Sequence, residues 1–291
     1  MIQRTNKAVK DSRQLTITKV IVFVLFAIYA ASLIFPFLWM VYNAGKTNAE
    51  FYANVWGWPE NWNNIWVNLN TALTMKIGKS TILTMTLRSL YLAAGGTVLS
   101  LLSSSCAAYV IARYKFPGRN LIYLVAISIM LIPTIGSTST TYRLLGDLNL
   151  LDSPIGLLLL YSGGFGFQFL LLHSAFRSIS PAYAEAAQID GAGHWTVFTR
   201  VMVPMILPTI APLAVLDFIN LWNDYFSPYL YMKSRPTLAV GLQFMVSQMQ
   251  YDANWPALFA LMLFSILPVL LLFIVFQKQI MSNVSAGGLK G

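Results

Sequence analysis

Long uncharged segments alternate with short polar segments along most of the chain. Five runs contain no charged side chain, and each is at least as long as the roughly 20 residues that a helix needs to cross a bilayer. These runs are Val20–Asn43, Ser89–Ala112, Leu121–Tyr142, Ser153–Phe176 and Trp255–Gln277. A sixth segment, from about Met205 to Pro228, is apolar except for Asp217 and Asp224. None of them alternates strictly and all are too long for ordinary strands, so the pattern predicts six transmembrane helices.

Composition supports a protein embedded in a membrane. The 291 residues are 57% hydrophobic and only 10% charged, whereas about a quarter of a soluble protein is charged. The first run follows basic residues, as in a signal peptide, but it is longer than a usual signal core and no cleavage pattern follows it. We therefore expect an all-α membrane protein whose first helix is retained.

The basic residues predict the orientation, because cytoplasmic segments are enriched in lysine and arginine. With the N-terminus inside, twelve of the 19 fall in cytoplasmic segments: Arg4, Lys7, Lys10, Arg13, Lys19, Arg113, Lys115, Arg119, Arg177, Arg200, Lys278 and Lys290. Tails 1–19 and 278–291 are then cytoplasmic. The net charge of +9 fits this orientation better than it fits nucleic-acid binding, which needs a basic patch on a soluble face.

The cytoplasmic segment 177–204 is long for a connection between spans. Ser180-Pro181 predicts a helix start, Ala182 to Ile189 favours helix, and Gly191 predicts its end. A second helix is expected from about His194 to Val203, before Pro204. Small side chains and one acid on the first helix suit a docking element, although a surface hairpin without a partner fits the same residues.

One spacing in this loop resembles a known motif. Glu185-Ala186-Ala187, then three residues, Gly191, nine residues and Val201-Met202-Val203-Pro204 resemble the EAA motif of ABC importer permeases. Val201 and Val203 stand where that family usually has Ile and Leu. The chain is similar to the six-helix partner subunit of maltose-transporter-type sugar importers, although its N-terminal third resembles that family only generally. The other similar stretches are Ala107-Ala108-Tyr109, Ala112-Arg113, Phe116-Pro117-Gly118-Arg119, Leu221-Trp222-Asn223-Asp224 and the tail Ser285–Gly291.

This resemblance implies a function and a set of partners. The whole chain, 1–291, would be one permease domain of a binding-protein-dependent importer for a sugar or oligosaccharide, in the cytoplasmic membrane of a bacterium or archaeon. It would lie in lipid, form half of the pathway, and work with a second permease, two ATPase subunits and an extracytoplasmic solute-binding protein. It would not be an enzyme and would hold no cofactor, because ATP and Mg²⁺ would bind to the ATPase subunits.

The resemblance also implies contact sites. Loop 177–204 would be the coupling loop between spans four and five that touches the ATPase, through Glu185, Ala186, Ala187, Asp190, Gly191, Ala192 and Pro204. The tail residues Gly287, Gly288 and Lys290 would reach the same interface. The outer loop near Gln248, Met249, Gln250 and Tyr251 would meet the binding protein.

The residues themselves show no motor or catalytic centre. Gly78-Lys79-Ser80 resembles the end of a phosphate-binding loop, but Leu73 stands where that motif needs its first glycine. The histidines, His173 and His194, have no metal-ligand spacing, and the single cysteine, Cys106, allows no internal disulfide. We find no nucleophile–base pair and predict no metal site.

Polar residues in the fifth span indicate a substrate path. Asp217, Asn220 and Asp224 are spaced i, i+3, i+7 and share a helix face, with Trp222 and Asn223 beside them. They would line a pathway for hydroxyl-rich cargo, since ionisable groups in membranes usually face a cavity or a partner. Alternatively, Asp224 lies in interfacial water, Asp217 pairs with a neighbouring helix, and Trp222 is an ordinary interfacial tryptophan. Asp217 also stands where the family usually has a neutral residue.

Two other functions remain open at this stage. A secondary transporter driven by an ion gradient would need ionisable groups at mid-membrane, where only Asp217 qualifies, and often has repeated halves. A membrane-embedded enzyme would need a catalytic cluster that the sequence does not offer. The spacing of the EAA-like loop favours the importer, and the sequence does not identify the cargo.

Overall fold

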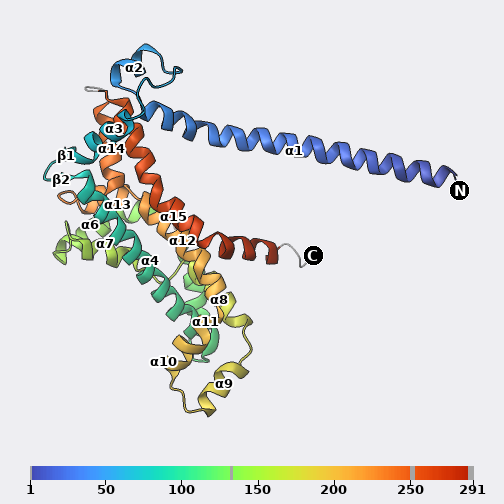
Figure 1. Cartoon of the computed structure of the whole chain (residues 1–291). Helices are drawn as coiled ribbons and strands as arrows, with labels where there is room; N and C mark the ends of the chain where they lie inside the picture. Colours follow the sequence, from blue (N-terminus) through green and yellow to red (C-terminus); the bar gives the residue numbers. More distant parts are fainter. Residues whose placement is uncertain (1, 132–133, 250–252, 288–291) are drawn as a thin grey trace. The chain divides into compact units, whose positions relative to one another are not determined.

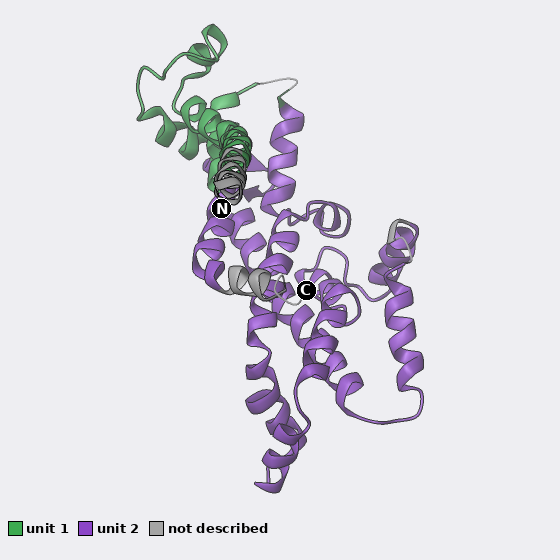
Figure 2. Cartoon of the chain, turned by 90° about the vertical axis from the view of Figure 1, so that its right-hand side faces the viewer, with its two compact units in different colours: residues 1–72, 249–264 green, residues 73–248, 265–291 purple. Residues whose placement is uncertain are grey.

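The computed structural model describes residues 2–131, 134–249 and 253–287, and nearly all of its regular structure is helical (Figure 1). The chain forms two compact units, coloured in Figure 2. Unit 1 holds residues 1–72 and 249–264, and unit 2 holds residues 73–248 and 265–291.

The first unit is built on one long apolar helix. Helix α1 runs Ile2–Ala44, so the predicted N-terminal tail continues the helix, and its stretch Thr18–Ala44 is long and apolar enough to span a membrane. Side chains along this stretch are open, with Phe23 73% exposed and Phe26 67% exposed. A helix with apolar residues all around it needs lipid or a partner to cover them.

The Trp- and Asn-rich segment after α1 is folded around a buried lysine. It carries α2 (Asn48–Ala53) and leads into α3 (Asn64–Thr74). Lys46 is 1% exposed and its Nζ donates hydrogen bonds to the carbonyl oxygens of Asn54 (2.9 Å) and Val55 (3.0 Å). Burial lowers the pKa of Lys46, and the nearby Glu50 carboxylate acts in the opposite direction. The segment between α1 and α3 is thus ordered by the hydrogen bonds of Lys46.

Aromatic side chains form the core of this unit. The ring of Trp39 lies 5.2 Å from that of Phe259, and Phe51 and Trp255 lie 5.7 and 6.0 Å from Phe259 between centroids. Edge-to-face and tilted aromatic contacts of this kind add to the free energy of burying the rings.

Helix α4 is the central element of the second unit. A short antiparallel hairpin, β1 (Lys76–Ile77) and β2 (Ser80–Thr81), precedes it. Helix α4 packs against four other helices. The bounds of these five helices are α4 Ile82–Arg113, α7 Pro154–Tyr161, α8 Phe167–Ser178, α12 Leu207–Asn223 and α14 Leu238–Gln248.

Small side chains on α4 allow this close packing. Ala93, Gly96, Ser100, Ser104 and Ala108 follow one another at helical spacing and all are buried. A Cβ added at Gly96 would come within 2.6 Å of the Leu221 side chain. Small residues at such spacing let helices approach closely in a membrane, where no hydrophobic effect drives helices together.

Two of the six predicted spans are interrupted. The run 121–142 overlaps three elements. Helix α5 (Arg119–Ile129) ends inside the run, and the 3₁₀ turn η1 (Thr134–Ser137) and helix α6 (Thr138–Asp147) follow. The run 153–176 is divided between α7 and α8 by residues 162–166, which include three glycines. The apolar composition of these runs did not predict the breaks. Breaks in a transmembrane helix are tolerated where protein or a cavity surrounds the backbone groups that lose their helical hydrogen bonds.

The remaining elements lie in the loop after α8 and in the last part of the chain. They are α9 Ala182–Ile189, α10 His194–Thr196, the π-helix η2 Val197–Met202, α11 Val203–Met205, α13 Phe226–Tyr231 and α15 Trp255–Gly287. Within the described residues, three helical stretches are long and apolar enough to span a membrane: Thr18–Ala44, Ile82–Arg113 and Trp255–Lys278. A fourth span is possible if the bent pair His194–Met205 and Leu207–Asn223 counts as one.

Candidate functional site

The loop between α8 and α12 begins with a short helix that ends in a left-handed glycine. Helix α9 is followed by Asp190 and then by Gly191, whose φ is +84°. The Gly191 N–H donates to the Gln188 carbonyl (3.0 Å), and the Ala192 N–H donates to the Ala187 carbonyl (2.9 Å). These two bonds define a Schellman ending, which satisfies carbonyls that the last turn would otherwise leave free. The turn predicted at Gly191 is confirmed, while α9 itself starts at Ala182, one residue later than Pro181.

The two faces of α9 differ in what they meet. Ala184 and Ala187, with Ala192 after the turn, pack against a buried cluster of the same chain. Glu185 and Ala186 are exposed, as are Asp190 and Gly191. Ile189 is 86% exposed at the end of α9. The predicted contact residues therefore divide, since Ala187 and Ala192 serve internal packing and the others face outward.

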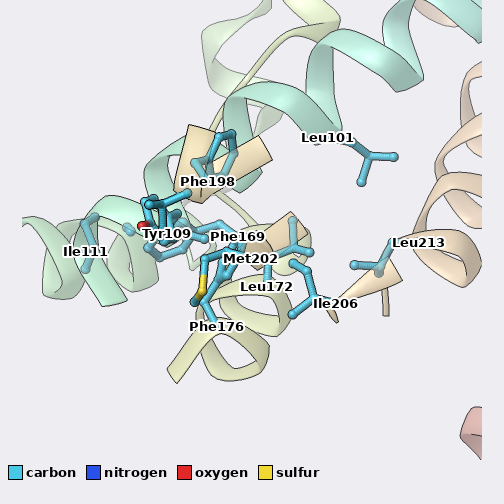
Figure 3. Packing of buried hydrophobic residues seen from close by; sticks show 13 residues of the cluster. Leu101, Tyr109, Ile111, Phe169, Leu172, Phe176, Phe198, Met202, Ile206 and Leu213 are labelled. Atoms are coloured by element: carbon cyan, nitrogen blue, oxygen red, sulfur yellow. The ribbon is translucent and has the colours of Figure 1, made fainter. Parts of the chain in front are cut away.

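The cluster beneath the loop joins α4, α8 and η2. Figure 3 shows Tyr109, Phe176 and Phe198 close together, with Met202 and Leu172 beside them. The rings of Tyr109 and Phe198 are 5.0 Å apart, and those of Tyr109 and Phe176 are 5.3 Å apart. This aromatic packing makes the loop a rigid extension of α4 and α8.

Two polar contacts tie the end of α4 to both halves of the loop. The Arg113 guanidinium donates from Nη2 to the Ile179 carbonyl at the end of α8 (2.6 Å). The Tyr114 hydroxyl lies 2.9 Å from Nδ1 of His194, at the start of α10. Sequence analysis missed these contacts, because the partners lie 66 and 80 residues apart and neither pair shows a local pattern.

The expected second helix of the loop is irregular. Its middle, η2, is a π-helix, and the axis then bends by 80° between Met205 and Leu207. Pro204 and Pro208 flank the bend and lack N–H donors, so the hydrogen-bond ladder cannot run straight through it. Pro204 therefore lies where the loop turns into α12.

Asp217 and Asn220 line a cavity in the second unit. The cavity has a volume of about 360 Å³ and lies between α4, α12 and the break before α8. Its other polar lining residues are Ser100, Ser104 and Gln168, and the Ser100 hydroxyl donates to Oε1 of Gln168 (3.0 Å). The predicted i, i+3 pair therefore shares a face and a cavity.

The other three predicted pathway residues make contacts within the chain. Trp222 is 5% exposed and its indole N–H donates to the Ser265 carbonyl (3.1 Å). The Asn223 side-chain amide donates to the Ile219 carbonyl (2.8 Å). Asp224 accepts hydrogen bonds from the Tyr161 hydroxyl (2.9 Å) and from the Ser227 N–H (3.1 Å). These contacts hold the end of α12, and of the five predicted pathway residues it is Asp217 and Asn220 that line the cavity.

The remaining predicted sites are only partly described. Gln248 is the last residue of α14 and Met249 follows it, whereas Gln250 and Tyr251 lie outside the described residues. Gly287 is the last residue of α15, and Gly288 and Lys290 lie outside the described residues. No group of three or more metal-ligating side chains occurs within the described part of the chain.

Comparison with known proteins identifies relatives along most of the chain. Residues 96–285 match the model of the family described as binding-protein-dependent transport system inner membrane component. The diacetylchitobiose uptake system permease protein NgcG of Streptomyces coelicolor is 32% identical over 271 residues, which cover 90% of this chain and 86% of that protein.

Two solved structures have a similar fold. One is a bacterial ABC transporter involved in the import of the acidic polysaccharide alginate, with a TM-score of 0.76 and 22% identity, covering 90% of this chain and 96% of that chain. The other is the bacterial alginate transporter in complex with an alginate pentasaccharide-bound periplasmic protein, with a TM-score of 0.54 and 16% identity, covering 87% and 92%.

Proposed function

The chain belongs to the family of binding-protein-dependent transport system inner membrane components, and from this membership we propose that it is a permease subunit of an ABC importer for carbohydrate. The family match over residues 96–285 carries the proposal, because it contains the whole loop 177–204 and the cavity beside Asp217. The chain is a multi-pass membrane protein, and its relative NgcG takes part in the uptake of a sugar.

We propose that the short helices complete six membrane crossings. In this arrangement α5 with α6, and α7 with α8, each form one interrupted span, and α12, which follows the bend at Ile206, forms the fifth. Both termini and the loop 177–204 then lie in the cytoplasm of a bacterium or archaeon, in agreement with the bias of lysine and arginine. The interruption between α7 and α8 is supported by the cavity that it borders.

The loop is proposed to be the contact with a separate ATPase, which would bind ATP and Mg²⁺. Its outward residues Glu185, Ala186, Asp190 and Gly191, with the open Ile189, offer small and apolar surface around one acid. The internally packed Ala187 and Ala192 hold that surface to the buried cluster of α4, α8 and η2. A rigid loop transmits movement because packed elements shift as units.

The other partners follow from the same proposal. A second permease subunit would form the other half of the pathway, and a solute-binding protein would dock on the outer side near Gln248 and Met249. The likeness to a transporter solved with its periplasmic protein supports such a partner. Asp217 and Asn220 would face the pathway, and the C-terminal tail would approach the ATPase.

Purification of the tagged chain from its native membrane, with mass spectrometry and an ATPase assay, tests the proposal. We expect a second permease and an ATPase subunit to accompany it, and hydrolysis to rise severalfold when the binding protein carrying its sugar is added. The assignment would be contradicted if the chain purified alone from its native membrane under conditions that keep a known importer intact.

A further inference from the structure

Asp217 places a carboxyl group inside α12 with one of its oxygens unpaired. Oδ2 of Asp217 is fully buried and has no hydrogen-bond partner among the described residues. The Gln168 and Ser100 side chains line the same cavity, and the Ser100 hydroxyl donates to Oε1 of Gln168. A buried polar atom without a partner destabilises the folded state, and more so when its group is charged. The neighbouring side chains therefore leave part of the hydrogen-bonding capacity of this carboxyl group unused.

The cavity beside Asp217 has room for a small ligand. Its volume of about 360 Å³ lies within the range of about 300–1,000 Å³ that small-molecule sites occupy. Among the residues that line it, Asp217 is the one charged side chain. Asn220 and Gln168 add amide groups, which can both donate and accept hydrogen bonds.

Part of the lining is apolar and partly open. Phe165 is 43% exposed and Phe167 is 59% exposed, and both belong to the break before α8 and its first turn. A sugar ring presents hydroxyl groups at its edge and C–H groups on its faces. A carboxylate and two amides near aromatic surface match both kinds of group.

We propose that Asp217, Asn220 and Gln168 form a cargo subsite within this subunit, which accepts the hydroxyl groups of a neutral sugar and disfavours acidic cargo. This inference rests on the proposed function. An ionised carboxylate accepts hydrogen bonds from hydroxyl groups more strongly than a neutral oxygen does. A carboxylate on the cargo would meet like charge, and such juxtaposition is a common source of specificity.

The charge of the subsite can be measured without knowing the cargo. In the complete complex in nanodiscs, with Cys106→Ser, the variant Asn220→Cys provides one thiol in the cavity. Its rates with a cationic and an anionic methanethiosulfonate reagent are compared with and without Asp217→Asn. We expect the cationic reagent to react faster, and the ratio of rates to fall severalfold when Asp217 is replaced, because local negative potential concentrates cations. An unchanged ratio would overturn the proposal.

Sugar uptake provides a second test of the subsite. With the sugar found on the copurified binding protein, Asp217→Asn should lower ATP-driven uptake severalfold, Asp217→Glu should restore part of it, and the exposed control Asp147→Asn should leave it unchanged. Full uptake by Asp217→Asn would overturn the subsite while leaving the permease function intact. A wild-type complex without ATP-driven uptake would instead contradict the proposed function, and the reagent ratio would still test the charged cavity.

Discussion

Gly191 shows how one backbone conformation shapes the loop. Its φ of +84° lies in the left-handed region, which costs a residue with a Cβ about 1–2 kcal/mol, whereas glycine adopts it freely. No atom lies within 4 Å of a Cβ added there, so a substitution would act through the backbone and not through a clash. Gly193, two residues later, also has open space but a φ of −70°.

We therefore expect Gly191→Ala to loosen the end of α9 and Gly193→Ala to leave it unchanged. Hydrogen exchange of the Gln188–Ala192 amides in nanodiscs would measure the difference, which should reach about fivefold to tenfold for a cost of about 1 kcal/mol. Equal protection in the two variants would show that the left-handed turn does not limit the stability of the loop.

Glu50 holds the segment between α1 and α3 together through its carboxylate. It accepts a hydrogen bond from the Thr47 backbone N–H and another from the Glu60 N–H (3.0 Å), while the Thr47 hydroxyl accepts from the Glu50 N–H. The hydrogen bond from the Thr47 backbone is the main cause that lowers the pKa of Glu50 below its ordinary value of 4.5. A depressed carboxyl pKa means that the ionised form stabilises the fold. That stabilisation is complete above the ordinary pKa and is lost as the pH falls through the lowered value.

The protection factors of the Thr47 and Glu60 amides should therefore be constant at neutral pH and fall below about pH 4. Glu50→Gln should reduce both factors severalfold already at pH 7 and remove most of this pH dependence. Glu60→Gln is the matched control, because Glu60 contributes its backbone N–H. Loss of protection at low pH in Glu50→Gln equal to that of the wild type would contradict this account.

At the scale of the elements, α4 links the loop to the cavity. Its C-terminal end holds the loop through Arg113 and Tyr114, and its middle contributes Ser100 and Ser104 to the cavity wall. A displacement of α9 would reach the cavity through this helix, because the aromatic cluster between them leaves little room for independent movement.

Arg113→Met should weaken this link. It removes the charged donor to the carbonyl of the half-buried Ile179, and a hydrogen bond to a charged group contributes about 1.5–3 kcal/mol. We expect faster amide exchange over residues 179–185 and a lower ratio of cargo uptake to ATP hydrolysis, both partly restored by Arg113→Lys. The control Lys115→Met removes an exposed charge two residues away and should change neither quantity. A normal uptake ratio in Arg113→Met would exclude Arg113 from the link.

Across the whole molecule, exposed apolar side chains indicate surfaces that lipid or another subunit covers. Leu25, Phe26 and Ile28 on α1 are each more than 60% exposed, as are Leu271 and Val275 on α15. Such surface belongs in lipid or against another subunit. A permease that forms half of a pathway has this property by necessity.

The sequence predicted the parts of the fold that depend on local chemistry. Long apolar runs identified α1, α4 and α15, and the turn at Gly191 followed from glycine's freedom at positive φ. The breaks between α5 and η1 and between α7 and α8 were not predicted, because a uniformly apolar run gives no signal for the end of a helix. The structural bond of Asp224 to Tyr161 was missed as well, since 63 residues separate the two side chains.

We propose that this chain couples sugar movement to ATP hydrolysis by a separate subunit through the loop 177–204. The most direct test is the amount of sugar taken up per ATP hydrolysed in proteoliposomes that hold the complete complex. Gly191→Asp adds a charged side chain at the exposed turn, and Gly193→Asp is its control. We predict that Gly191→Asp inserts normally but loses most uptake while hydrolysis continues, and that the control keeps both. Normal uptake per ATP by Gly191→Asp would contradict the claim.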